Sequence, residues 1–414
     1  MSINAISVGI NTSRQSSLWT HEESMAELSE LARTANIKII DSFSQTRDMP
    51  QSTSYIGKGK VEEIKLYCKE HCIGCVIFDD DLTPAQSKFL EKELNAKVID
   101  RTGLILDIFA LRAHTYEAKL QVEMAQLNYL MPRLTRLWTH LSRLGGGIGT
   151  RGPGEKQLEV DKRQITRRLG FIKRKLAKVK QDRGLRRKNR KTLPLISGAI
   201  VGYTNAGKST LLNTLTQSDV LAENKLFATL DPTSRNYRLP NKMNFILTDT
   251  VGFIQKLPHH LVKAFYSTLE EVTEADFIIH VIDASSPNMQ GCINTASDII
   301  KTLKADSKPQ LYLFNKWDQV KKPNMTTDLI KVYQPQLRLS ILHEFNIEHF
   351  QQQIEALLEP FNTQMTFHVP FTRMDVFNLL HQYGDVHSVD YQQDMIVEVT
   401  INQILGDKIM AALY

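Results

Sequence analysis

The feature of this sequence that most constrains its fold is the octapeptide at residues 202–209, which has the pattern G-x-x-x-x-G-K-S. An apolar run at residues 195–201 precedes it, and we expect a helix at residues 208–215. Between a strand and a helix, such a loop surrounds phosphate with backbone N–H groups and the helix N-terminus. The pattern therefore predicts a nucleotide site in an α/β sheet, with Lys208 on the β- and γ-phosphates and Ser209 on a magnesium ion.

A second motif, D-T-V-G at residues 249–252, begins at the end of the segment 244–249, N-F-I-L-T-D, which reads as a strand. A strand there would deliver Asp249 at the carboxyl edge of the sheet, where open α/β folds bind ligands. The Asp249 carboxylate can hold a magnesium-bound water. The Gly252 N–H can bond the γ-phosphate, so the segment that follows should respond to the state of the nucleotide.

A third motif, N-K-W-D at residues 315–318, follows the apolar run at residues 311–314. Asp318 can accept both the N1 and the N2 hydrogens of guanine, a bidentate contact that adenine cannot supply. This contact predicts that GTP is favoured over ATP by about 3 kcal/mol or more. The order of the three motifs is the order that a P-loop GTPase requires.

Two further segments complete the predicted site. Residues 227–233, F-A-T-L-D-P-T, lie between the first two motifs, and Thr229 and Thr233 are both candidates for closing over magnesium and the γ-phosphate. Residues 340–342 occupy the place of the last guanine-contacting loop. Many GTPases have Ser-Ala-x in that loop, and Ile341 departs from the pattern.

The residue after Gly252 is Phe253, where signalling GTPases commonly have the glutamine that orients the attacking water. A phenylalanine cannot orient water. We therefore hypothesise slow intrinsic hydrolysis that a partner accelerates. Gln255, His259 and His260 are alternatives for the orienting group.

Basic residues are concentrated in one segment. Residues 151–191 contain 17 Lys or Arg against 4 Asp or Glu, whereas the net charge of the whole chain is only +6. Such a segment can be a solvated helix face, but neutralising a phosphate backbone is the use that we favour.

Apolar residues recur at spacings of four and three on both sides of a glycine-rich segment, residues 145–154. This spacing is typical of a coiled-coil seam and predicts two antiparallel helices. Pro132 should kink or end the first helix, so that residues 133–155 form a long loop. Six glycines in residues 145–154 favour close contact between that loop and another molecule. The apolar positions are Leu120, Met124, Leu127, Met131, Leu134, Trp138 and Leu141, then Leu158, Ile165, Leu169, Ile172, Leu176 and Val179.

Residues 38–111 alternate short apolar runs with helical stretches, which predicts a parallel sheet. One helix should begin cleanly, with Thr83 as N-cap and Pro84 at the first helical position. We interpret the acidic residues 79–81 before it as turn-forming rather than metal-binding. Strands are also expected at residues 388–391 and 395–400.

The predicted fold class is α/β: a doubly wound P-loop GTPase sheet, preceded by a small parallel α/β subdomain and a helical hairpin, and followed by a short α+β tail domain. The expected domains are an N-terminal subdomain (1–111), a helical subdomain (112–192), a GTPase domain (193–361) and a C-terminal domain (362–414).

The N-terminus lacks a basic start followed by an apolar core, and no run of eighteen apolar residues occurs. We therefore expect a cytoplasmic protein without stable membrane insertion, with a partly membrane-peripheral protein as the alternative. We also expect a monomer.

The sequence resembles the bacterial HflX GTPases. The resemblance rests on the P-loop, residues 227–233 and the segment L-S-R-L-G-G-G-I-G-T-R-G-P-G-E at 141–155. It also rests on Y-I-G-K-G-K at 55–60 and L-Q-V-E-M-A-Q-L at 120–127, and covers residues 30–360.

The resemblance implies a protein that binds the large ribosomal subunit and its RNA, is stimulated there, and splits or rescues stalled ribosomes under stress. It implies that Thr229 is the magnesium threonine, that the basic helix lies on RNA, and that the glycine-rich segment extends towards the peptidyl-transferase region. One alternative is an RNA-remodelling ATPase or helicase. Asp318 distinguishes a GTPase from this alternative, because it reads guanine rather than adenine. A signalling GTPase is less favoured, because the chain has no lipidation motif at either end.

GTP or GDP is the expected ligand and Mg²⁺ the expected cofactor. Lys208 is expected to neutralise charge in the transition state, and no residue is assigned to orienting water. Ser209 and Thr229 are the expected metal ligands. The residues expected to contact the nucleotide are Gly202, Tyr203, Thr204, Asn205, Ala206, Gly207, Lys208, Ser209, Phe227, Ala228, Thr229, Leu230, Asp231, Asp249, Thr250, Val251, Gly252, Asn315, Lys316, Trp317, Asp318, Ser340, Ile341 and Leu342.

Overall fold

The computed structural model describes residues 3–12, 18–137, 153–190, 196–216, 226–241, 243–256, 266–343 and 345–413. The chain divides into two compact units. Unit 1 comprises Met1–Lys180, Lys225–Leu230 and Gln255–Tyr266. Unit 2 comprises Gln181–Asn224, Asp231–Ile254 and Ser267–Tyr414. Two short segments thus cluster with the N-terminal part of the chain. One lies between the first and second motifs, and the other follows the second motif.

Unit 1 is built on a four-stranded parallel sheet of order β2-β1-β3-β4. This confirms the parallel sheet predicted for residues 38–111, and adds a first strand that precedes them. The strand order changes direction at β1, because β2 lies on one side of it and β3 on the other. The strands are β1 (Ile3–Asn11), β2 (Ile37–Thr46), β3 (Cys75–Phe78) and β4 (Lys97–Asp100).

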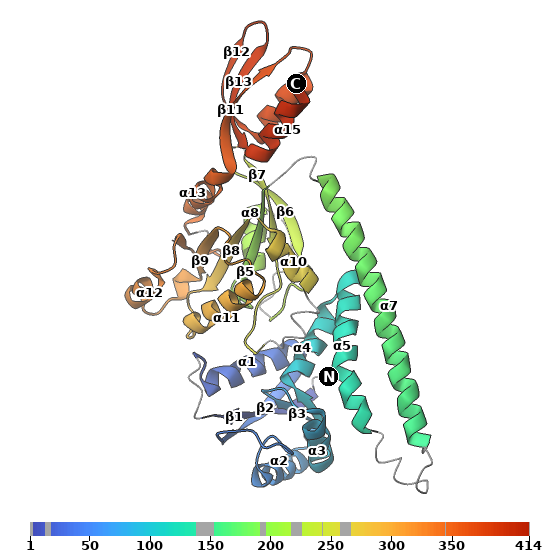
Figure 1. The fold of residues 1–414 in the computed structure, drawn as a ribbon. Helices are drawn as coiled ribbons and strands as arrows, with labels where there is room; N and C mark the ends of the chain where they lie inside the picture. The colour runs from blue at the N-terminus through green and yellow to red at the C-terminus, as the bar shows by residue number, and fades with distance from the viewer. Residues whose placement is uncertain are drawn as a thin grey trace. The chain divides into compact units, whose positions relative to one another are not determined.

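Helices cover both faces of this sheet, with α1 and α4 on one face and α2 and α3 on the other (Figure 1). The predicted start of α3 is confirmed, because Thr83 and Gln86 form a capping box and Pro84 is the first helical residue. The helices are α1 (His21–Thr34), α2 (Lys58–Glu70), α3 (Pro84–Leu94) and α4 (Arg101–Arg112).

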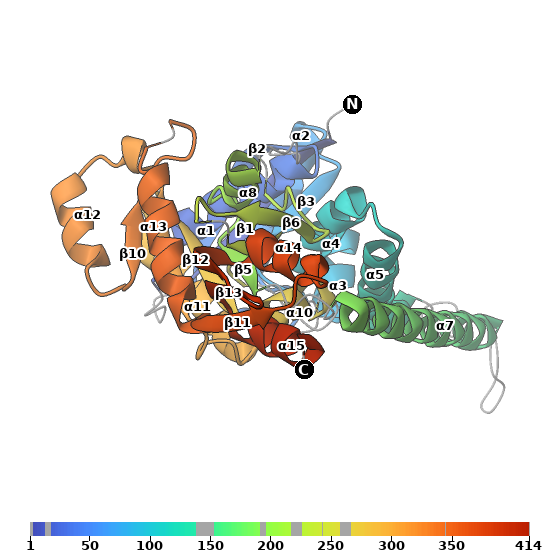
Figure 2. The same ribbon diagram turned by 90° about the horizontal axis from the view of Figure 1, so that it is seen from above.

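Two long helices follow, α5 (Tyr116–Leu137) and α7 (Pro153–Arg190), and they lie side by side in both views (Figures 1 and 2). Arg168 of α7 donates two hydrogen bonds to Glu123 of α5, at 2.6 and 2.8 Å. The predicted pair of helices is therefore present among the described residues.

The expectation that the first helix ends at Pro132 is wrong, because α5 continues through the proline to Leu137. Two contacts of Arg133 hold the turn that follows. Its guanidinium lies 3.4 Å from the centroid of the Tyr129 ring, within the same helix, and bonds to the Asp100 carboxylate, outside the helix, at 2.7 Å. Residues 133–137 are thus helical instead of forming part of a loop.

Unit 2 contains a six-stranded sheet of order β10-β9-β8-β5-β7-β6, parallel except for the β6–β7 pair. Helices α8 and α13 share one hydrophobic core with it, and α11 contacts β5 and β8. This is the predicted doubly wound sheet. Its strands are β5 (Ile196–Gly202), β6 (Thr233–Arg238), β7 (Asn244–Asp249), β8 (Phe277–Asp283), β9 (Gln310–Asn315) and β10 (Gln336–Arg338). Its helices are α8 (Lys208–Thr216), α10 (Tyr266–Glu274), α11 (Met289–Thr302), η1 (Trp317–Gln319), α12 (Pro323–Ile330) and α13 (Ile347–Leu358).

The C-terminal part of unit 2 is an antiparallel sheet of order β11-β13-β12 with two helices. Alternate residues of β13 are buried with α14 and α15 in a separate core. Both tail strands expected from the sequence are present. The elements are η2 (Glu359–Phe361), β11 (Asn362–Val369), α14 (Met374–Tyr383), β12 (Asp385–Tyr391), β13 (Met395–Asn402) and α15 (Gln403–Leu413).

None of the helices in the described part of the chain combines the length and the apolar composition that crossing a bilayer requires.

Candidate nucleotide-binding site

The phosphate-binding pattern forms the turn between β5 and α8. Gly202 has φ +150° and Gly207 has φ +99°, conformations that residues with a side chain rarely adopt. A Cβ atom on Gly202 would also lie 2.1 Å from the carbonyl oxygen of Val281 on β8. The two outer glycines of the pattern are therefore required by backbone geometry, and the loop lies at the carboxyl edge of the sheet.

Lys208 is enclosed by this loop. Its Nζ donates to the Tyr203 carbonyl oxygen at 2.8 Å, and only 7% of the residue is exposed. Burial lowers the pKa of Lys208 to about 8, against the opposing effect of the Asp249 charge. A phosphate is a stronger acceptor for an ammonium group than a carbonyl is, so this arrangement favours an anion in the loop.

The second motif lies beside the first. Asp249 ends β7 and is fully buried, and Ser209 donates its hydroxyl hydrogen to the Asp249 carboxylate at 2.6 Å. A Cβ atom on Gly252 would lie 2.9 Å from the Thr204 Cα and 3.0 Å from the Lys208 Nζ. The backbone at Gly252 therefore passes close to the phosphate-binding loop, as the predicted γ-phosphate contact requires.

Phe253 is a structural residue of this site. Its N–H donates to the Gly202 carbonyl at 3.0 Å, and its carbonyl accepts from the Thr204 N–H at 2.8 Å. The side chain is 2% exposed. Phe253 thus pairs through its backbone with the phosphate-binding loop, and the burial of its side chain accounts for an apolar residue where signalling GTPases commonly have glutamine.

The third motif joins the loop at residues 340–342 to the phosphate-binding loop. The Asn315 side chain donates to the Ala206 carbonyl at 2.8 Å and accepts from the Ile341 N–H at 3.2 Å. A hydrogen bond from Ser340 to Asp318 lowers the pKa of that carboxyl group. The structure therefore brings Ser340 and Ile341 to the predicted guanine-reading residues, whereas Leu342 is 74% exposed.

Asp283 is a residue of this site that sequence reasoning missed. Lys316 has φ +57°, and its Nζ donates to the Asp283 carboxylate at 2.7 Å. Asp283 ends β8, so its place after an apolar run at the carboxyl edge was the signal that could have revealed it. The guanidinium of Arg338 lies over the ring of Trp317, the next residue of the motif, at 5.3 Å from the ring centroid.

The segment between the first two motifs is divided. Phe227, Ala228, Thr229 and Leu230 belong to unit 1, and Asp231 begins the next part of unit 2. Thr233, the other candidate for magnesium, begins β6 and pairs with Asp249.

Other predicted features lie outside the described residues. They are His259, His260, residues 145–152 of the glycine-rich segment, and the apolar positions Trp138 and Leu141.

Three protein-family models match the chain in order. They are "GTP-binding GTPase N-terminal" at residues 22–110, "GTP-binding GTPase Middle Region" at residues 112–190 and "50S ribosome-binding GTPase" at residues 197–316.

Curated relatives named "GTPase HflX" match most of the chain. The protein from Caldanaerobacter subterraneus subsp. tengcongensis is 45% identical, over 90% of this chain and 86% of its own. The protein from Escherichia coli K12 is 44% identical, over 72% of this chain and 70% of its own. A solved GTP-binding protein from the archaeon Sulfolobus solfataricus, in complex with GDP, is 26% identical and covers 86% of this chain and 99% of its own, with a TM-score of 0.45.

Proposed function

Because the chain belongs to the HflX family of GTPases, which hydrolyse GTP, we propose that it binds the large ribosomal subunit and that this subunit stimulates its hydrolysis. We further propose that the GTPase splits or rescues stalled ribosomes under stress. The region at residues 197–316 matches a family described as ribosome-binding, which supports the choice of partner.

The observation that carries this proposal is the surface of α7. All nine Lys and Arg residues between Glu159 and Asp182 are exposed, whereas Leu169 and Ile172 are buried. Exposed cations at this density release counterions when they neutralise the phosphates of RNA, which supplies affinity without sequence preference. The exposed basic residues are Lys162, Arg163, Arg167, Arg168, Lys173, Arg174, Lys175, Lys178 and Lys180.

An aromatic residue lies within this basic surface. Phe171 is 39% exposed, and the cationic groups of Arg168 and Lys175 lie 5.4 and 5.5 Å from its ring centroid. Aromatic rings and arginine planes are the groups on which unpaired RNA bases stack. The combination supports RNA over an acidic protein as the partner of α7.

The geometry of the site supports the nucleotide roles that we propose. Lys208 would neutralise the β- and γ-phosphates, the Gly252 N–H would bond the γ-phosphate, and Asp318 would read guanine. Magnesium fits the residues present, because the Ser209 hydroxyl and the buried Asp249 carboxylate form an oxygen pair of the kind that this ion prefers. Ser209 and Thr229 would hold the ion, which when bound would neutralise charge on the phosphate oxygens.

The test is a charge reversal on α7. The variant Arg174→Glu, Lys175→Glu, Lys178→Glu should lose most of its binding to purified large subunits in sedimentation assays, and the salt dependence of the remaining binding should be shallower. The matched control reverses three exposed lysines of unit 2, Lys321, Lys322 and Lys331, and should bind normally. Equal binding by the two variants would contradict the assignment of α7 to RNA.

A further inference from the structure

The hydroxyl group of Thr204, the third residue of the phosphate-binding loop, is a buried group that the assigned roles do not use. Thr204 is only 7% exposed. Its Oγ1 atom is shielded from solvent and has no hydrogen-bond partner among the residues that the structure describes. The large majority of buried polar groups in proteins have a partner, because burying one without a partner is costly. A valine would fill almost the same space without that cost, so packing alone does not account for the hydroxyl.

The neighbouring donors of the site already have partners. Ser209 donates its hydroxyl hydrogen to the Asp249 carboxylate at 2.6 Å, and Thr250 donates to a backbone carbonyl of β5 at 2.7 Å. The backbone N–H of Thr204 donates to the Phe253 carbonyl at 2.8 Å. The hydroxyl is therefore the donor of Thr204 that remains for a ligand.

This hydroxyl lies where the γ-phosphate is expected. A Cβ atom on Gly252 would lie 2.9 Å from both the Cα and the Cγ2 atoms of Thr204, and 3.0 Å from the Lys208 Nζ. Since Oγ1 and Cγ2 are bonded to the same carbon, the hydroxyl is close to the same point. Lys208 and the Gly252 N–H are the groups assigned to the γ-phosphate, so the Thr204 side chain lies beside both.

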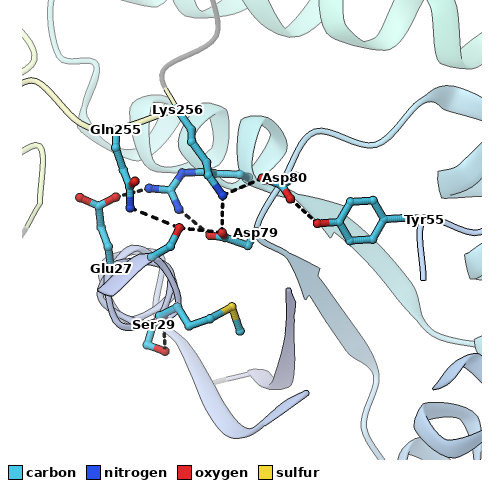
Figure 3. Close-up of polar contacts among 10 residues, drawn as sticks. Glu27, Ser29, Tyr55, Asp79, Asp80, Gln255 and Lys256 are labelled. Carbon is cyan, nitrogen blue, oxygen red and sulfur yellow. Dashed lines mark hydrogen bonds and ion pairs between the residues drawn. The ribbon is translucent and has the colours of Figure 1, made fainter. Parts of the chain in front are cut away.

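Gln255, which the sequence offers for orienting the attacking water, is engaged elsewhere. It is 5% exposed, and its side-chain amide donates to the hydroxyl of Ser24 on α1 at 3.2 Å (Figure 3). The other two candidates from the sequence, His259 and His260, lie outside the described residues. Gln255 thus has a partner of its own, whereas the Thr204 hydroxyl has none in the described part of the chain.

We propose that Thr204 is a catalytic residue that positions the attacking water, with its Oγ1 accepting a hydrogen bond from the water and donating its own hydrogen to a γ-phosphate oxygen. A hydroxyl can do both at once, whereas an apolar side chain can do neither. The water is then held beside the phosphorus that it attacks. The inference rests on the proposed contacts of Lys208 and Gly252 with the γ-phosphate.

The reaction leaves Thr204 unchanged. The water oxygen forms a bond to the γ-phosphorus, and the bond from that phosphorus to the bridging oxygen breaks, with its electron pair remaining on GDP. Both water hydrogens end on the released phosphate, one on the oxygen that attacked and one on a former γ-phosphate oxygen. Thr204 acts by orientation alone, because a hydroxyl is too weak a base to remove the proton at neutral pH. This role agrees with slow hydrolysis by the protein alone.

The test is single-turnover hydrolysis of GTP by the full chain without ribosomal subunits, together with the affinities for GDP and for a non-hydrolysable GTP analogue. Thr204→Val should lower the hydrolysis rate about 10- to 100-fold, while the affinity for GDP is unchanged and that for the analogue falls by no more than about threefold. Thr204→Ser keeps the hydroxyl and should recover most of the rate. The melting temperature of nucleotide-free Thr204→Val should be equal or higher, because valine removes a buried unpaired hydroxyl.

Thr34→Val is the matched control, because Thr34 is a buried threonine of α1 whose hydroxyl donates to the Glu30 carbonyl, and its rate should be that of the unmodified chain. An unchanged rate in Thr204→Val overturns the proposal. If Thr204→Val does not fold, Thr204→Ser and Thr204→Ala carry the test, since the two variants differ by one hydroxyl. Equal rates in these two overturn the proposal as well.

Lys208→Met tests the phosphate site itself and should lose affinity for both GDP and the analogue. If it binds both as the unmodified chain does, the proposed phosphate site is wrong, and the role of Thr204 falls with it. A normal rate in Thr204→Val, together with the expected loss in Lys208→Met, means that only the role of Thr204 is wrong. Because no subunits are present, neither result depends on the ribosomal partner.

Discussion

Asp318 and Ser340 show how single side chains prepare the guanine-reading end of the site. The hydrogen bond from Ser340 lowers the pKa of Asp318 and fixes its carboxylate, which is therefore charged at neutral pH. A fixed, charged acceptor can take both hydrogens of the guanine N1 and N2 positions. We therefore propose that guanine specificity rests on Asp318 of the third motif and on Ser340, two residues that the sequence assigns to separate guanine-contacting segments.

Asp318→Asn should weaken GTP binding about 100-fold, because the amide turns one of the two acceptors into a donor that faces the guanine N2 group. Xanthine has a carbonyl oxygen at that position, so binding of xanthosine triphosphate should improve. Competition against a fluorescent nucleotide measures both effects. Asp328→Asn, at an exposed aspartate, is the control and should change neither. Equal binding of ATP and GTP by the unmodified chain would contradict the guanine-reading role.

His280 is a buried residue whose effect depends on pH. It lies in the middle of β8, and burial together with the nearby Lys208 charge lowers its pKa to about 4. Between about pH 6.5 and 4 the unfolded chain therefore binds a proton that the folded chain does not, so stability falls as the pH falls. The loss at pH 5 should be about 2 kcal/mol.

His280→Phe should remove this loss, which urea denaturation at pH 5 and pH 7.5 measures. The exposed His349→Phe serves as the control and should retain the pH dependence of the unmodified chain. If His280→Phe loses as much stability as the unmodified chain between the two pH values, the buried imidazole is not its source.

At the scale of elements, the turn between β5 and α8 depends on its glycines. Gly202→Ala should unfold or distort the loop, at a cost of about 2 kcal/mol or more, because φ +150° and the Val281 carbonyl both exclude a side chain. Nucleotide binding should be lost with it. Gly170→Ala, inside α7 and with open space around it, should instead stabilise the chain by about 0.5–1 kcal/mol. Thermal unfolding with and without GDP distinguishes the two.

The parts of the fold that could be predicted are those that depend on residues close together in the sequence. The phosphate-binding loop, the strands that lead into each motif and the capped start at Thr83 depend on neighbouring residues, and all are present in the structure. The helix through Pro132 could not be predicted, because the Asp100 carboxylate that bonds to Arg133 lies far away in the sequence.

The candidate site was predictable to a similar extent. Its motif residues follow strands, and their spacing reveals them, whereas the Asp283 partner of Lys316 has no motif. The interpretation of residues 79–81 as turn-forming was incomplete, because the partners of Asp79 are distant in the sequence and no motif marks them. Asp79 serves Arg101, Ser24 and Lys256, none of which is its neighbour in the sequence.

At the scale of the whole molecule, the chain crosses between its two compact units within the segments that should sense the nucleotide. Phe253 leaves the motif without a side chain that can orient water, and α7 offers an extended basic surface. These features together favour a GTPase whose activity is completed by an RNA-rich partner rather than one that acts alone.

The rate of GTP hydrolysis by the full chain, measured with and without purified large ribosomal subunits at low and high salt, tests this account most directly. We expect slow hydrolysis by the protein alone, a large increase with subunits at low salt, and a loss of that increase as the salt concentration rises. A rate that is the same with and without subunits, or one above about 1 per second for the protein alone, would contradict the account.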